Sequence, residues 1–194
     1  MEERLMDKWS RAMNHPLLAF QKGDKEIAWS LVGLTILVDS LVVILFDYFL
    51  GNGQIVSPLD LMKGMELIIF GIMTYLVICT ILWAVGKLFA SSLSWRDHVK
   101  AWGITYMPTL LCAICVVITE NYFYLFVGNI LLGAVINVVF IGILLWKTLL
   151  FIIYLREFVG LKGYKFWGAG LILGVCILLL AWGNAWVGLR TPVL

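Results

Sequence analysis

Residues 126–155 read FVGNILLGAVINVVFIGILLWKTLLFIIYL, an apolar run in which Lys147 is the single charged residue. A helix needs about 20 mostly apolar residues to cross the hydrocarbon core of a bilayer, so this run is long enough to cross it with tilt. Its apolar residues are continuous and do not alternate with polar ones, which argues against a strand of a membrane barrel. The stretch therefore predicts a transmembrane α-helix.

Four further segments have the same character, namely residues 27–50, 66–90, 101–119 and 166–187. The connections between the segments are short and contain turn residues, as in Gly51-Asn52-Gly53. We expect an all-α polytopic membrane helix bundle with five transmembrane helices. Residues 27–194 would form this single domain, and residues 1–26 would form a cytoplasmic N-terminal segment.

The composition agrees with a membrane protein. Of the 194 residues, 62% are hydrophobic and 13% are charged, whereas a soluble domain has roughly 45–50% apolar and about 25% charged residues. The excess apolar surface must face lipid. Since no connection is long enough for a folded domain outside the membrane, we expect any activity to reside in the bilayer, at its surfaces or in a partner.

The basic residues are distributed unevenly between the two sides of the predicted bundle. Eleven fall before the first span, in the region where the second span ends and the third begins, or between the fourth and fifth: Arg4, Lys8, Arg11, Lys22, Lys25, Lys87, Arg96, Lys100, Arg156, Lys162 and Lys165. Only Lys63 and Arg190 fall on the opposite side. Short loops rich in lysine and arginine remain in the cytoplasm, so the N-terminus is predicted to be cytoplasmic and the C-terminus to lie outside.

The N-terminal segment has an amphipathic pattern. Leu5, Trp9 and Met13 recur at four-residue spacing, and charged residues occupy the other faces. This pattern favours a short helix on the cytoplasmic membrane surface that ends near His15-Pro16. The alternative is a partly ordered tail.

Two charged residues are predicted at membrane depth. Asp39 lies about 12 residues into the first span, roughly 18 Å along the helix, and Lys147 lies roughly 13 Å before Arg156. Their similar level suggests a buried ion pair that joins the first span to the fourth. Alternatively, Lys147 extends toward the cytoplasmic headgroups, or Asp39 lines a proton or ion pathway.

Two other residues in the spans have structural interpretations. Asn137 could donate a hydrogen bond to another helix, which is its usual role in lipid. Pro108 is predicted to kink the third span and to free a backbone carbonyl.

The sequence contains no cluster that predicts catalysis, a metal or a cofactor. Cys112 and Cys115 have thioredoxin-like spacing, but they lie inside a span and no loop holds a second cysteine pair to pass electrons on. We therefore expect the cysteines to pack between helices. His15 and His98 are expected at the cytoplasmic surface, without other ligands nearby. These patterns predict that the protein is not an enzyme.

Three stretches carry a family resemblance: NHPLLAF at residues 14–20, SWRDHVKAWGITYMP at residues 94–108, and residues 145–162, which begin LWK and contain LREFVGLK. Together they resemble the Yip family of Ypt/Rab-interacting membrane proteins in its compact prokaryotic form, over residues 14–187. The resemblance implies five spans, a cytoplasmic N-terminus and a non-enzymatic role in membrane organisation. The eukaryotic members contact Rab GTPases through a long N-terminal region, which here is only 26 residues long.

The leading functional hypothesis is a scaffold or accessory subunit of a transport, export or membrane-organisation complex in the cell membrane, or in Golgi or ER if the chain is eukaryotic. Its partners would be the bilayer and another membrane protein, such as a transporter, or a second copy, and no nucleic acid. The alternative is a small channel or transporter that uses Asp39, with Asn137 and Lys147. A third hypothesis is membrane shaping by the N-terminal helix.

Overall fold

The computed structural model describes residues 9–10, 13–22, 25–42 and 58–187. Within these ranges every regular element is a helix and no residue is in a strand, which confirms the predicted all-α class. The elements are α2 (Pro16–Lys22), α3 (Lys25–Leu37), η1 (Val38–Val42), α5 (Pro58–Leu88), α6 (Trp95–Trp102), η2 (Gly103–Thr105), α7 (Tyr106–Asn121), α8 (Phe123–Gly128), α9 (Ile130–Ile153), η3 (Tyr154–Phe158) and α10 (Tyr164–Val187). Of the η elements, η2 is a 3-10 helix, and η1 and η3 are π-helices.

Four stretches of these helices are long and apolar enough to cross a membrane: Met62–Leu88, Trp95–Thr119, Ile130–Phe158 and Tyr164–Val187. They correspond to the second to fifth predicted spans, although the third begins at Trp95 instead of residue 101. Of the first predicted span, the structure describes residues 27–42, as most of α3 and η1, and residues 43–50 lie outside the described residues. Most of the predicted N-terminal surface helix also lies outside them, although Trp9 and Met13 are helical.

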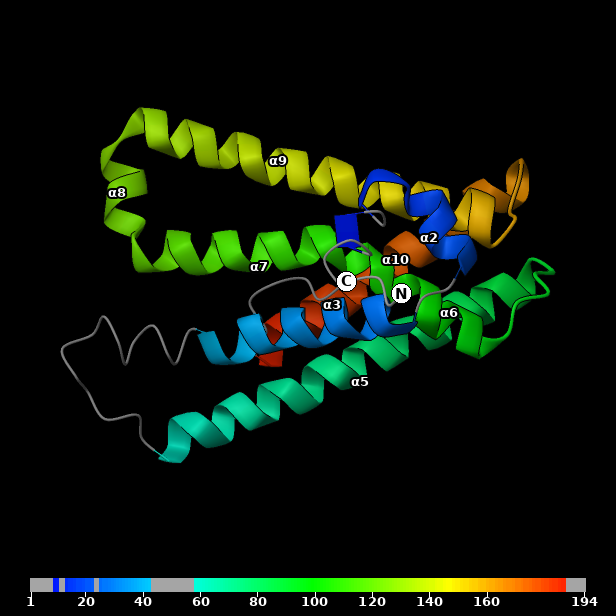
Figure 1. Ribbon diagram of the computed structural model, residues 1–194, viewed down its shortest axis with the longest axis horizontal. Helices are drawn as coiled ribbons and strands as arrows, with labels where there is room; N and C mark the ends of the chain where they lie inside the picture. The colour runs from blue at the N-terminus through cyan, green and yellow to red at the C-terminus, as the bar shows by residue number, and fades with distance from the viewer. Residues whose placement is uncertain (1–8, 11–12, 23–24, 43–57, 188–194) are drawn as a thin grey trace, which may run out of the picture.

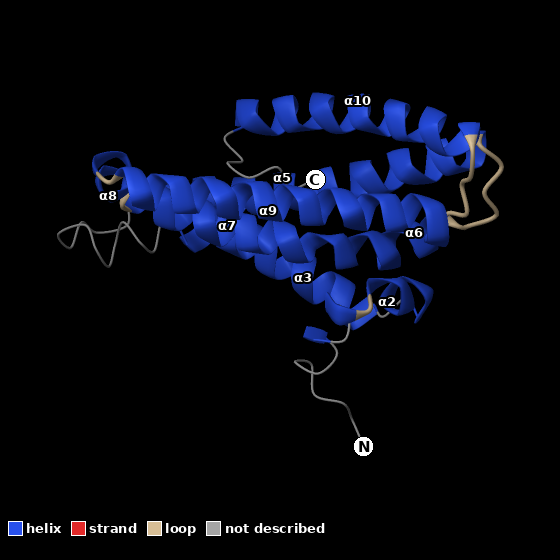
Figure 2. Ribbon diagram, turned by 90° about the horizontal axis from the view of Figure 1, so that it is seen from above, coloured by secondary structure: helices blue, strands red, loops and turns tan. Residues whose placement is uncertain are grey.

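The long helices run side by side and alternate in direction (Figure 1). Helix α3 contacts both α5 and α7, and α7 and α9 form a hairpin that α8 closes at one end. Helix α10 packs mainly along α5 and makes few contacts with α9, its predecessor in the chain (Figure 2). The connections at residues 89–94 and 159–163 lie at the same end of the molecule, opposite α8.

An aromatic core forms where α2, α6 and η3 meet. The Tyr154 ring contacts Trp102 at 5.0 Å and Phe20 at 5.8 Å between ring centroids. His98 is fully buried in this core, and its Nδ1 shares a hydrogen bond with the Tyr154 hydroxyl. The prediction that His98 lies at the surface was therefore wrong, because α6 is amphipathic and turns His98 and Trp102 inward.

Gly103 allows η2 to approach α3 closely. A Cβ atom at this position would lie 2.7 Å from the Cβ of Ala28 and 2.8 Å from its carbonyl oxygen. No side chain larger than hydrogen fits there without moving one of the two backbones. The absence of a side chain at Gly103 therefore sets the distance between η2 and α3.

The rest of the described chain leaves most residues of α9 and α10 exposed or partly exposed. In their most apolar stretches, 17% and 11% of the residues are buried, against 61% in the most apolar stretch of the span Trp95–Thr119. The exposed residues are mainly large and apolar, for example Leu144, Leu171 and Leu178. Such a surface requires lipid or another apolar helix as its neighbour.

Candidate functional site

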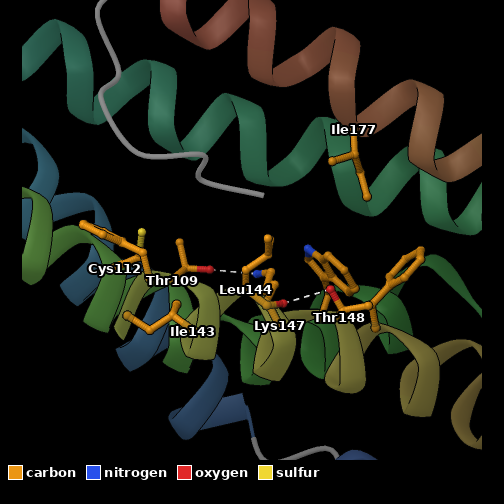
Figure 3. A pocket seen from close by; sticks show the side chains of 10 residues that line it. Thr109, Cys112, Ile143, Leu144, Lys147, Thr148 and Ile177 are labelled. Atoms are coloured by element: carbon orange, nitrogen blue, oxygen red, sulfur yellow. Dashed lines mark hydrogen bonds between the residues drawn. The ribbon is translucent and has the colours of Figure 1, made fainter. Parts of the chain in front are cut away.

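A half-open pocket of about 290 Å³ lies between α7, α9 and α10 (Figure 3). Its lining residues come from α6, α7, α9 and α10: Trp102, Thr109, Cys112, Phe140, Ile143, Leu144, Lys147, Thr148, Phe151 and Ile177. We call it the Lys147 pocket, since Lys147 is the one charged side chain among these residues. Thr109 and Lys147 lie on the wall formed by α7 and α9, and Ile177 faces them from α10.

The Lys147 ammonium is held against α7. Its Nζ donates hydrogen bonds to the Thr105 carbonyl oxygen at 3.0 Å and to Thr109 Oγ1 at 2.8 Å, and it lies 3.5 Å from Thr105 Oγ1. The same nitrogen lies 4.9 Å from the centroid of the Tyr106 ring and 5.4 Å from that of Trp102. Lys147 thus bonds across to the neighbouring segments η2 and α7.

The backbone around Pro108 forms the acceptor side of this contact. Pro108 has no N–H and cannot donate to the carbonyl of Ile104, four residues earlier. Pro108 is the third residue of α7, and the 3-10 turn η2 at Gly103–Thr105 precedes this helix. Thr105 and Thr109 are four residues apart and therefore share one face of the helix, which explains how one ammonium reaches both.

The cationic head of Lys147 is in an environment that stabilises it only in part. Removing a charged group from water is expensive unless hydrogen bonds or other charges compensate for it. Here two threonine oxygens supply hydrogen bonds, and the faces of Trp102 and Tyr106 add cation–π attraction. These partners are neutral, so the positive charge itself remains available to an anion that reaches the pocket.

Asp39 lies nearby on another element. It is 7% exposed and belongs to the π-helix η1, which packs against α5 and α7. Helix α7 also carries Cys112, which lines the Lys147 pocket. The hydrogen bonds of Lys147 described above join α9 to α7, and the ion pair between Asp39 and Lys147 stays a prediction.

Asn137 lies on the exposed side of α9, and an interhelical hydrogen bond from it stays a prediction. A different asparagine bonds within the chain. The Thr74 hydroxyl of α5 donates to Asn184 Oδ1 of α10 at 2.8 Å, and both residues are buried. The sequence interpretation missed this contact, although an asparagine in the last turn of an apolar span was a usable signal.

The sequence interpretation also missed Gly170 and Gly174, the glycine pair of α10. They form the pattern Gly-x-x-x-Gly, and a Cβ atom at either position would meet no neighbouring atom within 4 Å. In membrane proteins this spacing lets two helices approach closely. Within the described chain, no neighbouring atom fills the space beside these two glycines, although Ile177, one turn further along the same helix, lines the Lys147 pocket.

The remaining candidates add no further site. All four cysteines are free thiols, and Cys112 and Cys115 are partly buried in α7. Among the described residues, no group of three or more histidine, cysteine, aspartate or glutamate side chains could hold a metal ion.

Comparison with known proteins gives no match: no protein-family model, no curated protein and no solved structure is similar to the chain.

Proposed function

We propose that the protein is a non-enzymatic membrane scaffold or accessory subunit, which binds a helix of another membrane protein through the glycine pair of α10. The observation that carries this proposal is the open space at Gly170 and Gly174, on a helix with 11% of its most apolar stretch buried. Helices in lipid gain little from hydrophobic burial and associate by close packing at small residues. The glycine pair offers such packing to a helix from outside the chain.

The position of α10 leaves the glycine pair accessible. Ala169 and Leu173 are buried against the rest of the bundle, and α10 packs mainly on α5. Gly170 and Gly174 each follow one of these residues and therefore lie about 100° further around the helix. A partner helix could thus contact α10 without displacing α5.

The membrane arrangement that goes with this proposal has five spans and a cytoplasmic N-terminus. The connections at residues 89–94 and 159–163, which lie at one end of the molecule, border the basic residues Arg96, Lys162 and Lys165. We propose that this end faces the cytoplasmic side of the cell membrane. The resemblance to the Yip family supports a role in membrane organisation, or in a transport or export complex.

The test is co-purification in mild detergent after cross-linking in native membranes, with the bound proteins identified by mass spectrometry. Gly170→Leu together with Gly174→Leu should remove the partner, because the leucines fill the space that its helix needs. Gly142→Leu is the matched control: Gly142 is also in open space, but on α9. Recovery of the wild-type protein as a lone monomer, or equal partner recovery with all variants, would contradict the proposal.

A second candidate function, a small channel or transporter, is favoured by one observation. Asp39 is buried within a π-helical segment, and both intramembrane carboxylates and π-helical segments are frequent at functional sites. Asp39→Asn should then abolish ion or solute flux into reconstituted vesicles at an unchanged protein level. A variant that folds in lower yield but conducts normally would assign Asp39 a structural role.

A further inference from the structure

A second hydrogen-bond donor belongs to Trp102, a residue that lines the Lys147 pocket. Trp102 lines the pocket and is 1% exposed, and its indole Nε1 has no hydrogen-bond partner among the described residues. The Lys147 ammonium lies 5.4 Å from the centroid of the Trp102 ring. A buried N–H without an acceptor is unfavourable, so a ligand that brings an oxygen acceptor would satisfy a group that the chain leaves unsatisfied.

The ammonium also has capacity left. It carries three N–H donors, of which two are directed to the Thr105 carbonyl and to Thr109 Oγ1. The remaining contact, to Thr105 Oγ1, is long at 3.5 Å. These oxygens are neutral, and a carboxylate would form a stronger, charge-assisted hydrogen bond with Lys147.

The rest of the pocket suits an apolar chain. Phe140, Ile143, Leu144, Phe151 and Ile177 form most of its wall. Its volume of about 290 Å³ is near the lower end of the roughly 300–1,000 Å³ found for ligand pockets. Because it is half open and α10 makes few contacts with α9, a longer chain can continue from it into the bilayer.

We propose that the Lys147 pocket binds a long-chain fatty acid from the bilayer, with its carboxylate on Lys147 and Trp102 and its acyl chain between α9 and α10. The depth of Lys147 favours this ligand over a phospholipid. Lys147 lies nine residues before Arg156, roughly 13 Å along the helix. A phosphate headgroup would have to leave the membrane surface to reach Lys147, whereas a fatty acid carries one small acidic group and can enter the bilayer as the neutral acid.

Binding is measured with radiolabelled palmitate on the purified full-length chain in nanodiscs of a zwitterionic phospholipid, without any partner protein. The wild type should bind palmitate, and methyl palmitate should compete about tenfold or more weakly, because the ester lacks the charge. Lys147→Met should lower palmitate affinity by a similar factor, and Leu144→Trp should lower it by filling the pocket. Lys87→Met is the matched control, since Lys87 is exposed on α5 and bonds to the Ser91 carbonyl.

Four outcomes would overturn the proposal: no palmitate binding to the wild type, equal competition by palmitate and its methyl ester, displacement by phosphatidylglycerol as effective as by palmitate, or unchanged affinity in Lys147→Met. The comparison of palmitate with its ester uses the wild-type protein, so it remains decisive if a variant fails to fold. The experiment needs no partner, and its result does not depend on the proposed scaffold role.

Discussion

The hydrogen bond from Thr74 to Asn184 joins the neighbouring helices α5 and α10 through two buried side chains. Replacing Thr74 with valine keeps the shape of the side chain but leaves the buried Asn184 amide without this partner. We expect Thr74→Val to lower the free energy of unfolding by about 1 kcal/mol, the order found for hydrogen bonds between membrane helices.

The free energy of unfolding is measured by titrating the purified protein with a denaturing detergent and following the loss of folded protein. Thr148→Val is the control, because the Thr148 hydroxyl is exposed and bonds only to the Leu144 carbonyl of its own helix. It should change the unfolding free energy by a few tenths of a kcal/mol at most. Equal effects of the two substitutions would show that the bond between α5 and α10 contributes little.

Among the individual residues of the site, only some could be predicted from the sequence. Counting residues along a span gave the depth of Lys147 and marked it as important, but depth says nothing about the direction in which a side chain leaves the helix. The structure directs Lys147 to Thr105 of η2 and Thr109 of α7. Trp102 could not be singled out, because its unsatisfied N–H depends on what the folded chain places around it.

Among the helical elements, the contact between η2 and α3 is the one most sensitive to a single methyl group. Gly103→Ala would place a Cβ atom 2.8 Å from the Ala28 carbonyl oxygen, and backbone atoms cannot move away without disturbing the bundle. We expect destabilisation by about 1–3 kcal/mol, as for other overpacked sites. The same unfolding curve measures it.

Gly142→Ala is the control for this substitution. Gly142 also lies in a helix, but a Cβ atom there would meet no neighbouring atom within 4 Å. Since alanine favours a helix more than glycine does, Gly142→Ala should leave stability unchanged or raise it slightly. If both alanine variants behaved alike, the close approach of η2 to Ala28 would not be a constraint on packing.

Most of the long helices could be predicted from the sequence, because a long, continuously apolar segment can satisfy its backbone hydrogen bonds in a bilayer only as a helix. The start of the third span at Trp95 was missed, since the segment from Ser94 to Lys100 is charged and reads as a loop. The Asp97 carboxylate accepts a hydrogen bond from the Ser94 backbone N–H at 2.9 Å, as in a capping box. Serine followed three residues later by an acid was therefore the available signal for that helix start.

For the molecule as a whole, the connections at residues 89–94 and 159–163 lie at one end and α8 lies at the other. If the long helices cross the membrane, cysteines introduced at Ser92 and Lys162 should react with an impermeant maleimide from the cytoplasmic side. A cysteine at Gly128 should react from the opposite side. The background would carry alanine at the four native cysteines, and labelling of all three positions from one side would contradict this arrangement.

The opening between α9 and α10 has a consequence for how a bilayer-dissolved ligand meets the pocket. The ligand would enter laterally from the surrounding lipid. It would therefore reach the pocket by diffusion in the plane of the membrane. Occupancy of the Lys147 pocket would then follow the mole fraction of fatty acid in the bilayer. Adding empty phospholipid vesicles that exchange fatty acid with the nanodiscs, at constant total palmitate and protein, should lower the occupancy by dilution alone.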